Sequence, residues 1–567
     1  MRRPLTRTFV VLLSLFIPAL ETLTAQEGTS PLPGVFSEVL DVRVVNLEIV
    51  VTDKDGVPVR GLRPEDFVLR VAGEEIAIEY FSEIRNGVAA PQPVGESGAQ
   101  VAEIPVVLPG EPVGTSYLVF IDEFFAIARD RDTVLQALLK QLPRMGPEDR
   151  MAIVAYNGRD LDMLSSWSQS VPALERVLED ALERRTHGLE RLAERRQFDF
   201  DRVLLASSRI RNGLVGPEDF YRTDLDPDER FYLERLTGQV QQTVTAAVST
   251  LRSFAMPPGR KVMLLYSGGW PFFPVTFIGP NISPIVVSPR TDTGTGLFRP
   301  LTDTANLLGY TLYPVDMPGF NDLLSGDAGM QTGGFLRDPT AGNLGLGQST
   351  FLRQQEVQYT LNFLAAETGG LAFIDQARQK AFDSAVSDTR SYYWLGFTPD
   401  RDWDNRRHDV EVALRQGGFR VRSRKDYLDA SQQHEVTMAL ESSLLFGSPP
   451  GTGELGLKIG EPKKAGRNRM EVPITVLIPL SEVTFLPDGK EQVTQLELRV
   501  VVRDEDGGRA DIPVVPVEIR SETVPGANKV GRFDTALKLR RKRHDAVVAI
   551  YDPASGRILS ASAEITP

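Results

Sequence analysis

From residue 115 onward the sequence alternates short, continuously apolar runs with amphipathic helical patterns, and this alternation restricts the fold more than any other feature. A continuously apolar run is typical of a strand that is covered on both faces. Strands alternating with helices predict an α/β domain over residues 115–390, with a doubly wound, mainly parallel sheet and helices on both faces. The expected strands are SYLVFID, DRMAIVAYNG, GRKVMLLYSGGW and LGYTLYPVDM, with a fifth after the Gly-Gly turn of LNFLAAETGGLAFI.

Segments with a strand-like period of two flank this domain. Val45, Leu47, Ile49 and Val51 alternate with more polar neighbours, which predicts a small antiparallel β unit over 37–85. Residues 86–114 are rich in Pro and Gly and are expected to form a linker. Residues 391–428 again alternate like strands. Neither β segment alone has enough strands to bury a face, so we expect the two to pair, with the α/β domain inserted between them.

The C-terminal region, 434–567, is expected to be entirely β. Apolar residues alternate over 470–478 and 496–502, and turn sequences such as PDGK and DPASGR recur. Several short strands separated by turns predict an immunoglobulin-like sandwich. The stretch 271–350 is rich in Gly, Pro, Ser and Thr, and we interpret it as a long loop insertion over the ligand edge of the α/β sheet.

The N-terminus has the order of a signal peptide. A basic start, MRRPLTR, precedes an apolar core, TFVVLLSLFIPAL, and a small or polar tail, ETLTAQ. We expect residues 1–25 to be removed on export, which places the protein in the periplasm, in the cell envelope or outside the cell. A short membrane anchor is the alternative. No later stretch has the length and apolarity of a membrane span.

Composition excludes several kinds of chemistry. The chain has no cysteine, so disulfides, thiolate zinc sites and cysteine nucleophiles are absent. Its four histidines show no metal-ligand spacing. A formal charge of −13 argues against a general nucleic-acid binder. Neither a P-loop nor a G-x-S-x-G elbow occurs.

Two adjacent carboxylates, Asp122 and Glu123, end the first strand of the α/β domain. Ligands of open α/β sheets bind at the carboxyl ends of the strands, so these side chains are the first candidates for a site. A buried aspartate at such a place can hold a metal, take part in chemistry, or accept hydrogen bonds from neighbouring backbone N–H groups and cap the following helix.

Several motifs together resemble the von Willebrand factor type A-related proteins abundant in acidobacteria. They occur in the expected order over roughly residues 40–428, and the family implies a secreted protein with a type A fold and no enzymatic activity. The motifs are VVTDKDGVPVRGLRPEDF, FIDEFF, PGRKVMLLYSGG, LYPVDM and SYYWLGFTPD with FRVRSRKDYL.

The type A fold often carries a metal-ion-dependent adhesion site, and the resemblance implies where its ligands would lie. Asp122 matches the first position of the Asp-x-Ser-x-Ser motif, but Phe124 and Ala126 stand where serines are needed. Gly268 or Gly269 stands where a later aspartate is needed, and Thr186 matches the threonine position. Because Mg²⁺ needs several well-placed oxygens, this pattern predicts a degenerate site without a metal.

The remaining candidates for binding are aromatic. Five aromatic residues could make the mouth of the sheet apolar and suit a protein partner, or they could simply be covered by the 271–300 loop. They are Phe124, Phe125, Trp270, Phe272 and Phe273.

These patterns predict a non-enzymatic protein–protein interaction or adhesion module without a cofactor. The first alternative is a Mg²⁺-dependent adhesion domain with Asp122, Glu123 and Thr186 as ligands. The second is an enzyme with an unrecognised site, which would require a base beside Ser267.

Overall fold

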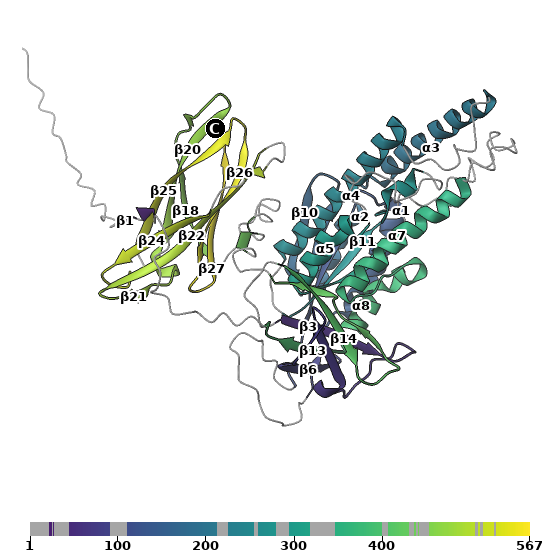
Figure 1. Cartoon of the computed structure of the whole chain (residues 1–567), viewed down its shortest axis with the longest axis horizontal. Coiled ribbons are helices and arrows are strands. Elements are labelled where there is room, and N and C mark those ends of the chain that lie inside the picture. Colours follow the sequence, from purple (N-terminus) through teal and green to yellow (C-terminus); the bar gives the residue numbers. More distant parts are fainter. Residues whose placement is uncertain are drawn as a thin grey trace, which may run out of the picture. The chain divides into compact units, whose positions relative to one another are not determined.

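The computed structural model describes residues 22–24, 26–27, 45–90, 110–212, 225–254, 259–278, 294–317, 346–399, 406–429, 436–437, 440, 453–504, 509–510, 514–526 and 529–566. The chain divides into two compact units. One contains residues 40–446, and the other combines residues 447–567 with residues 1–39. The chain has a mixed α/β architecture with several separate sheets (Figure 1).

A five-stranded sheet in the order β10-β9-β8-β11-β12 forms the centre of the larger unit. Strands β8 (Thr115–Asp122), β9 (Arg150–Tyr156), β11 (Arg260–Ser267) and β12 (Tyr310–Asp316) are parallel. Strand β10 (Leu161–Ser168) is an antiparallel edge strand beside β9. The carboxyl ends of the four parallel strands therefore meet at one edge of the sheet.

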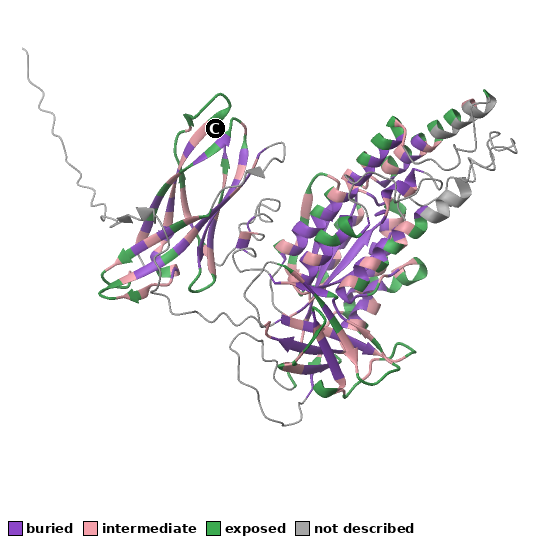
Figure 2. Cartoon of the chain, viewed as in Figure 1, coloured by how far each residue is buried: buried purple, intermediate pink, exposed green. Residues whose placement is uncertain are grey.

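Helices cover both faces of this sheet, as the apolar runs predict. Alternate residues of β8 belong to two different core clusters, because successive side chains of a strand point to opposite faces. One face packs against α1 (Ala128–Gln141), α2 (Val171–Leu182) and α8 (Ala381–Thr389). The other packs against α3 (Gly188–Arg211), α4 (Pro227–Ser253), α5 (Thr295–Leu307) and α7 (Leu346–Thr368). The burial colours of Figure 2 show the sheet as the most buried layer of the unit.

The long helix α4 shows how local sequence fixes an element. Asp226 precedes the helix, and its carboxylate accepts a hydrogen bond from the backbone N–H of Glu229 at 2.9 Å. The Glu229 carboxylate in turn accepts one from the Asp226 N–H at 3.1 Å. This reciprocal capping box and the following Pro227 define the start of the helix.

The small β unit is assembled from both sides of the α/β domain. One sheet has the order β15-β3-β13-β6-β7 and the other β16-β14-β4-β5, so strands from before residue 90 pair with strands from after residue 391. The N-terminal strands are β3 (Val45–Thr52), β4 (Phe67–Val71), β5 (Glu74–Ile76), β6 (Tyr80–Arg85) and β7 (Val88–Ala89). The later strands are β13 (Tyr392–Phe397), β14 (Arg407–Leu414), β15 (Arg420–Arg422) and β16 (Asp426–Leu428).

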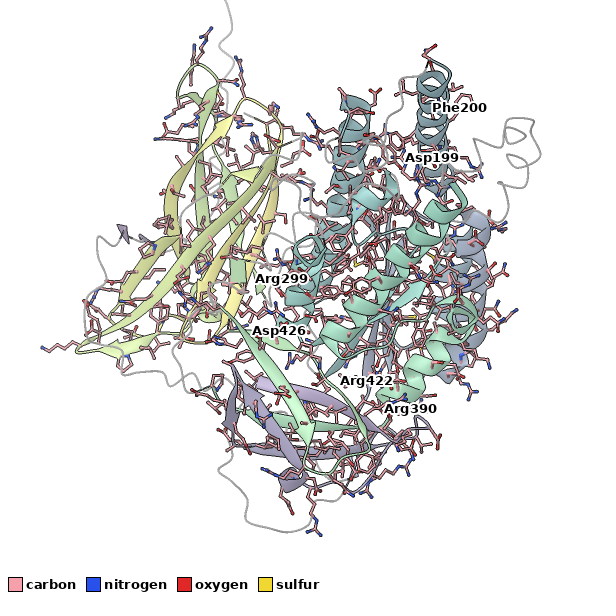
Figure 3. All side chains as sticks on the ribbon, turned by 45° about the vertical axis from the view of Figure 1, so that its right-hand side comes forward. Asp199, Phe200, Arg299, Arg390, Arg422 and Asp426 are labelled. Atoms are coloured by element: carbon pink, nitrogen blue, oxygen red, sulfur yellow. The ribbon has the colours of Figure 1, made fainter. Side chains whose placement is uncertain are left out.

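Polar contacts connect this β unit to the helices of the α/β domain. Arg422 of β15 donates a hydrogen bond to Asp388 of α8 at 3.2 Å, and Asp426 of β16 accepts one from Asn306 of α5 at 3.0 Å. Figure 3 places Arg422, Asp426 and Arg390 at this junction. The bridging contacts explain why both parts fall within one compact unit.

Strand β13 is the central strand that joins the two halves of the β unit, and Leu395 on it is fully buried. We expect Leu395→Ala to lower the free energy of unfolding by about 3 kcal/mol, the usual cost of emptying a core leucine site. Urea unfolding measures this change, and hydrogen–deuterium exchange should rise in residues 45–52 and 80–85. Val57→Ala is the control, because Val57 is 57% exposed and its truncation should cost less than about 0.5 kcal/mol. Equal effects of the two changes would contradict the pairing.

The C-terminal unit consists of two sheets that share one hydrophobic core. The first sheet contains β1 (Thr22–Thr24), β25 (Val530–Arg540), β20 (Arg469–Pro479), β18 (Gly456–Ile459) and β19 (Lys463–Lys464). The second contains β17 (Gly453–Glu454), β27 (Arg557–Ile565), β26 (His544–Asp552), β22 (Glu491–Asp504), β24 (Val515–Ser521), β2 (Gln26–Glu27), β21 (Leu486–Asp488) and β23 (Arg509–Ala510). Strand β1 lies within the segment 1–25 for which the sequence predicts removal.

Several expectations about local structure are wrong. The stretch 271–350 is not one loop, because it contains α5, β12 and the start of α7. The residues after the Gly-Gly turn form only an isolated bridge between Phe373 and Val315, and the fifth strand of the sheet is β10. At the ends of the expected linker 86–114 the structure has β7 and a bridge between Val88 and Pro112, and residues 91–109 of this linker lie outside the described residues. Within the described part of the chain, no helix is long and apolar enough to cross a membrane.

Candidate functional site

The carboxyl edge of the parallel strands brings together four polar side chains. Asp122 ends β8, Tyr156 ends β9, Ser267 ends β11 and Asp316 ends β12. The register pairs Asp122 with Tyr156, and Ser267 with Asp316, so these residues occupy one level of the sheet. The first candidate of the sequence analysis therefore lies where open α/β sheets bind ligands.

Asp122 is fully buried, and protein groups surround its carboxylate. Oδ1 accepts hydrogen bonds from the backbone N–H groups of Phe124 and Phe125, each at 3.1 Å. Oδ2 accepts them from the Ser267 hydroxyl at 3.0 Å and the Trp270 indole N–H at 2.8 Å. The expected bonds to nearby backbone N–H groups are present, but α1 begins after Ile127 without a side-chain cap, so Asp122 does not cap it.

Burial raises the pKa of Asp122 from 3.8 to about 6, because the low-dielectric interior disfavours the charged form. The four hydrogen bonds act in the opposite direction, since each donor stabilises the carboxylate. Near neutral pH the group is therefore mostly ionised, and the four protein donors stabilise its negative charge.

The aromatic residues do not form an exposed rim, so this alternative for the mouth of the sheet is wrong. Trp270 and Phe125 are 0% exposed, and Phe272 is 4% exposed. Trp270 stacks on Phe298 of α5 with ring centroids 6.2 Å apart. Phe272 contacts that ring as well as Tyr359 and Phe363 of α7. The covering elements are helices α5 and α7, which the sequence analysis partly assigned to a loop.

Phe124 is only partly buried, and it packs inward beside Phe125. The guanidinium of Arg191 lies over its ring, 4.8 Å from the centroid. Gly158 approaches the same ring so closely that a Cβ there would overlap Phe124, and its φ of +97° also favours glycine. The Phe124 ring is therefore enclosed on two sides by protein.

Glu123 is 1% exposed and is held by two arginines. Arg184 donates two hydrogen bonds to its carboxylate, at 2.7 and 3.1 Å, and Arg131 lies 3.8 Å away. Burial raises the pKa of Glu123, and the Arg184 guanidinium opposes this change. These guanidinium groups occupy the oxygens that a metal ion would need.

The loop that carries Thr186 lies against the end of β8. The N–H of His187 donates to the Glu123 carbonyl at 2.8 Å, and the N–H of Gly188 donates to the Ala126 carbonyl at 2.9 Å. A Cβ at position 188 would overlap the Ala126 carbonyl, so glycine permits this approach. The structure thus brings the Thr186 loop to the candidate edge, where Arg184 of the same loop pairs with Glu123.

We expect Arg184→Met to lower the free energy of unfolding by about 2 kcal/mol, because Glu123 would lose two charge-assisted hydrogen bonds while staying buried. Chemical denaturation at neutral pH measures the change. Arg185→Met is the matched control, since this neighbouring arginine is exposed and pairs with the exposed Glu190. Its loss should cost less than about 1 kcal/mol. Equal losses of unfolding free energy in the two variants would show that the buried Glu123–Arg184 pair stabilises the fold no more than an exposed ion pair does.

The remaining positions at this edge add few metal ligands. Phe124, Ala126, Gly268 and Gly269 have no side-chain oxygen. Asp316 has a pKa raised by burial to about 6, and Arg378 lies 3.9 Å from its carboxylate. Across the described ranges, no group of three or more His, Cys, Asp or Glu side chains is arranged to hold a metal ion.

The sequence analysis missed Arg184 and Arg131, and it named Trp270 only as an aromatic residue of the mouth, not as a hydrogen-bond donor to Asp122. Ser267 was considered only as a possible nucleophile, and both it and Asp122 are fully buried. The signal that could have predicted the contact of Trp270 with Asp122 is its position three residues after the end of β11, a parallel neighbour of β8. Arg184 stands two residues before Thr186, in the loop already aligned with this edge.

The chain matches no protein-family model and no curated protein. Among solved structures it is similar to a target of the Northeast Structural Genomics Consortium, with 14% identity over 20% of this chain and 84% of that chain and a TM-score of 0.12. It is also similar to the TFIIH p34 N-terminal domain, with 11% identity over 48% of this chain and 97% of that chain and a TM-score of 0.17. Likenesses this distant carry no argument about fold or function.

Proposed function

We propose that this chain is an exported, non-enzymatic protein-binding protein whose α/β domain is a von Willebrand factor type A-like domain without a working metal site. Its C-terminal unit is an immunoglobulin-like sandwich, and the mature protein acts in the periplasm, in the cell envelope or outside the cell. The resemblance of the sequence motifs supports the family, and the basic and apolar N-terminal segment supports export.

The hydrogen bonding of Asp122 carries the central part of this proposal, the absence of a working metal site. A metal ion and an N–H or O–H donor compete for the same carboxylate lone pairs, and four donors already use both oxygens of Asp122. Mg²⁺ gives up its water reluctantly and needs near-octahedral oxygen ligands. The indole N–H of Trp270 points its partial positive charge at the carboxylate, where a metal ion would otherwise place its charge. Because Trp270 is buried in the core, this side chain cannot move away without disrupting the packing.

The two alternatives receive less support from the same geometry. A metal-dependent adhesion site would need Glu123 as a ligand, and Arg184 holds that carboxylate. An enzyme based on Ser267 has a carboxylate beside the hydroxyl, at 3.0 Å, but the pair is closed to a substrate by complete burial.

The proposal is tested by titrating the full chain with Mg²⁺ and Mn²⁺ in a calorimeter, with Asp122→Ala as the control variant. We expect no saturable heat for either protein, and no increase in the melting temperature of the wild type at millimolar metal. A saturable isotherm that disappears in Asp122→Ala would establish the metal-dependent alternative instead.

A further inference from the structure

Helix α3 carries an apolar stripe that no other described element covers. Leu189, Ala193, Gln197, Phe200 and Leu204 follow one another at spacings of four, four, three and four residues, which places them on one helical face. Leu189 is 62% exposed, Phe200 40% and Leu204 41%. Three large apolar side chains exposed along one helical face, with Ala193 and Gln197 between them, are typical of a face that a partner covers.

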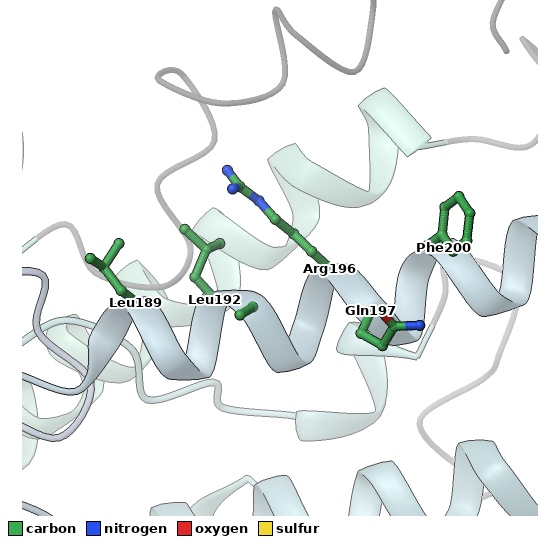
Figure 4. A pocket seen from close by; sticks show the side chains of 6 residues that line it. Leu189, Leu192, Arg196, Gln197 and Phe200 are labelled. Atoms are coloured by element: carbon green, nitrogen blue, oxygen red, sulfur yellow. The ribbon is translucent and has the colours of Figure 1, made fainter. Parts of the chain in front are cut away.

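A groove of about 370 Å³ lies on this stripe, lined by Leu189, Leu192, Ala193, Arg196, Gln197 and Phe200. Figure 4 shows these side chains along a single stretch of the helix. The groove begins one residue after Gly188, whose N–H donates to the Ala126 carbonyl in the segment between β8 and α1, so the groove starts close to the ligand edge of the sheet and follows the helix from there.

The charges around the groove indicate what a partner must bring. Glu190 pairs with Arg185 at 2.6 Å, Glu194 pairs with Arg191 at 2.9 Å, and the amide of Gln197 donates to Asp201 at 2.9 Å. Among the described residues that line the groove, Arg196 is the one charged side chain, and no described residue forms an ion pair with it. The charge left uncompensated in the groove is therefore positive.

We propose that this groove binds an amphipathic helical segment of another protein that presents apolar side chains at i, i+4 and i+7 and a carboxylate to Arg196. A helix that lays its apolar face into a groove is a common mode of peptide recognition. The inference rests on the proposed protein-binding function and names the surface and the partner chemistry.

A second copy of α3 fits the groove less well. Glu190, Glu194 and Asp201 follow one edge of the stripe. In an antiparallel pair of identical helices related by a twofold axis, each edge faces the same edge of its partner, so these acidic groups would oppose one another. A partner with its own acidic group opposite Arg196 avoids that repulsion.

The test is to select a displayed library of amphipathic helical peptides against the full chain and to measure the affinity of the enriched peptides by fluorescence anisotropy. We expect the enriched peptides to carry Asp or Glu beside the apolar residues. Arg196→Glu and Phe200→Ser should each weaken binding by at least about tenfold. A peptide in which the acidic residue is exchanged for Lys should recover affinity for Arg196→Glu.

Phe231→Ser is the matched control, because Phe231 is a 64% exposed aromatic on α4 that does not line the groove, and its loss should leave binding unchanged. Melting temperatures of all variants check that folding is retained. Failure to enrich peptides, or enriched peptides that ignore the α3 variants, would overturn the groove proposal. A wild-type dimer in sedimentation velocity that Phe200→Ser dissociates would also overturn it, in favour of self-association.

These outcomes differ from a failure of the proposed function. Saturable Mg²⁺ binding at Asp122 would overturn the metal-free function while leaving the groove result unaffected. Peptides that bind elsewhere on the chain would keep the protein-binding function and remove only the assignment to α3.

Discussion

Trp270→Ala is expected to lower the free energy of unfolding by about 4 kcal/mol, the usual cost of emptying a large buried aromatic site. Trp270 is 0% exposed, stacks on Phe298 and donates its indole N–H to Asp122. Both the packing and the hydrogen bond disappear in this variant. Urea unfolding followed by far-ultraviolet circular dichroism measures the loss.

A double-mutant cycle isolates the hydrogen bond from the packing. Trp270→Phe keeps an aromatic ring but removes the N–H, and Asp122→Asn keeps the shape of the acceptor but removes its charge. At pH 7 the coupling energy between the two positions is expected to be about 2 kcal/mol, typical of a hydrogen bond to a charged group. A coupling near zero would mean that the indole does not stabilise the carboxylate.

The stability of the wild type relative to Asp122→Asn is expected to fall by about 2.4 kcal/mol between pH 4 and pH 7. The pKa of Asp122 rises from 3.8 to about 6 on folding, so the folded state binds the proton more tightly than the unfolded state. The favourable contribution is therefore fully present below pH 3.8 and is lost as the pH rises through 6. The asparagine amide of the variant does not titrate in this pH range, so it adds no pH dependence to the free energy of unfolding.

The test depends on how the difference in unfolding free energy between wild type and Asp122→Asn changes with pH, and not on the absolute size of that difference. The amide of the variant places an N–H₂ group against donors that need an acceptor, which destabilises the variant by an amount independent of pH. Other buried acids with a raised pKa, such as Asp316 and Asp303, titrate in both proteins and cancel in the difference. Parallel stability curves of wild type and variant from pH 4 to pH 7 would contradict the raised pKa.

The buried strands could be predicted from sequence because their apolar runs are continuous. Strands β8, β9, β11 and β12 coincide with the four runs, since a strand covered on both faces has no polar period. The shared sheet of the two β segments follows from a similar requirement, because neither segment could bury a face without the other.

The elements that could not be predicted from sequence are those whose hydrophobic pattern is weak. Strand β10, with the sequence LDMLSSWS, is a half-exposed edge strand and has no apolar run. Helix α5 contains Pro300 and begins beside Gly294 and Gly296, which together give it the composition of a loop. Its apolar side chains Leu297, Phe298 and Leu301 are buried in the core, and this tertiary packing outweighs the low helix propensity of the segment.

The candidate edge was predictable only in part, for the same reason. Asp122 is found from its place at the end of a buried strand, which is local information. The burial of Trp270 and Phe272 depends on α5 and α7, which follow them by roughly 25 to 90 residues, and no local pattern reports that coverage. The Glu123–Arg184 pair likewise joins residues that are 61 positions apart.

The most direct measurement of the central claim is the ¹⁹F spectrum of the protein labelled with 5-fluorotryptophan. The chain has four tryptophans, and Trp270→Phe assigns the resonance of interest. If protein donors alone satisfy Asp122, this resonance shifts with a midpoint near pH 6 and does not respond to millimolar Mg²⁺. A Mg²⁺-dependent shift of the Trp270 resonance that vanishes in Asp122→Ala would contradict the claim.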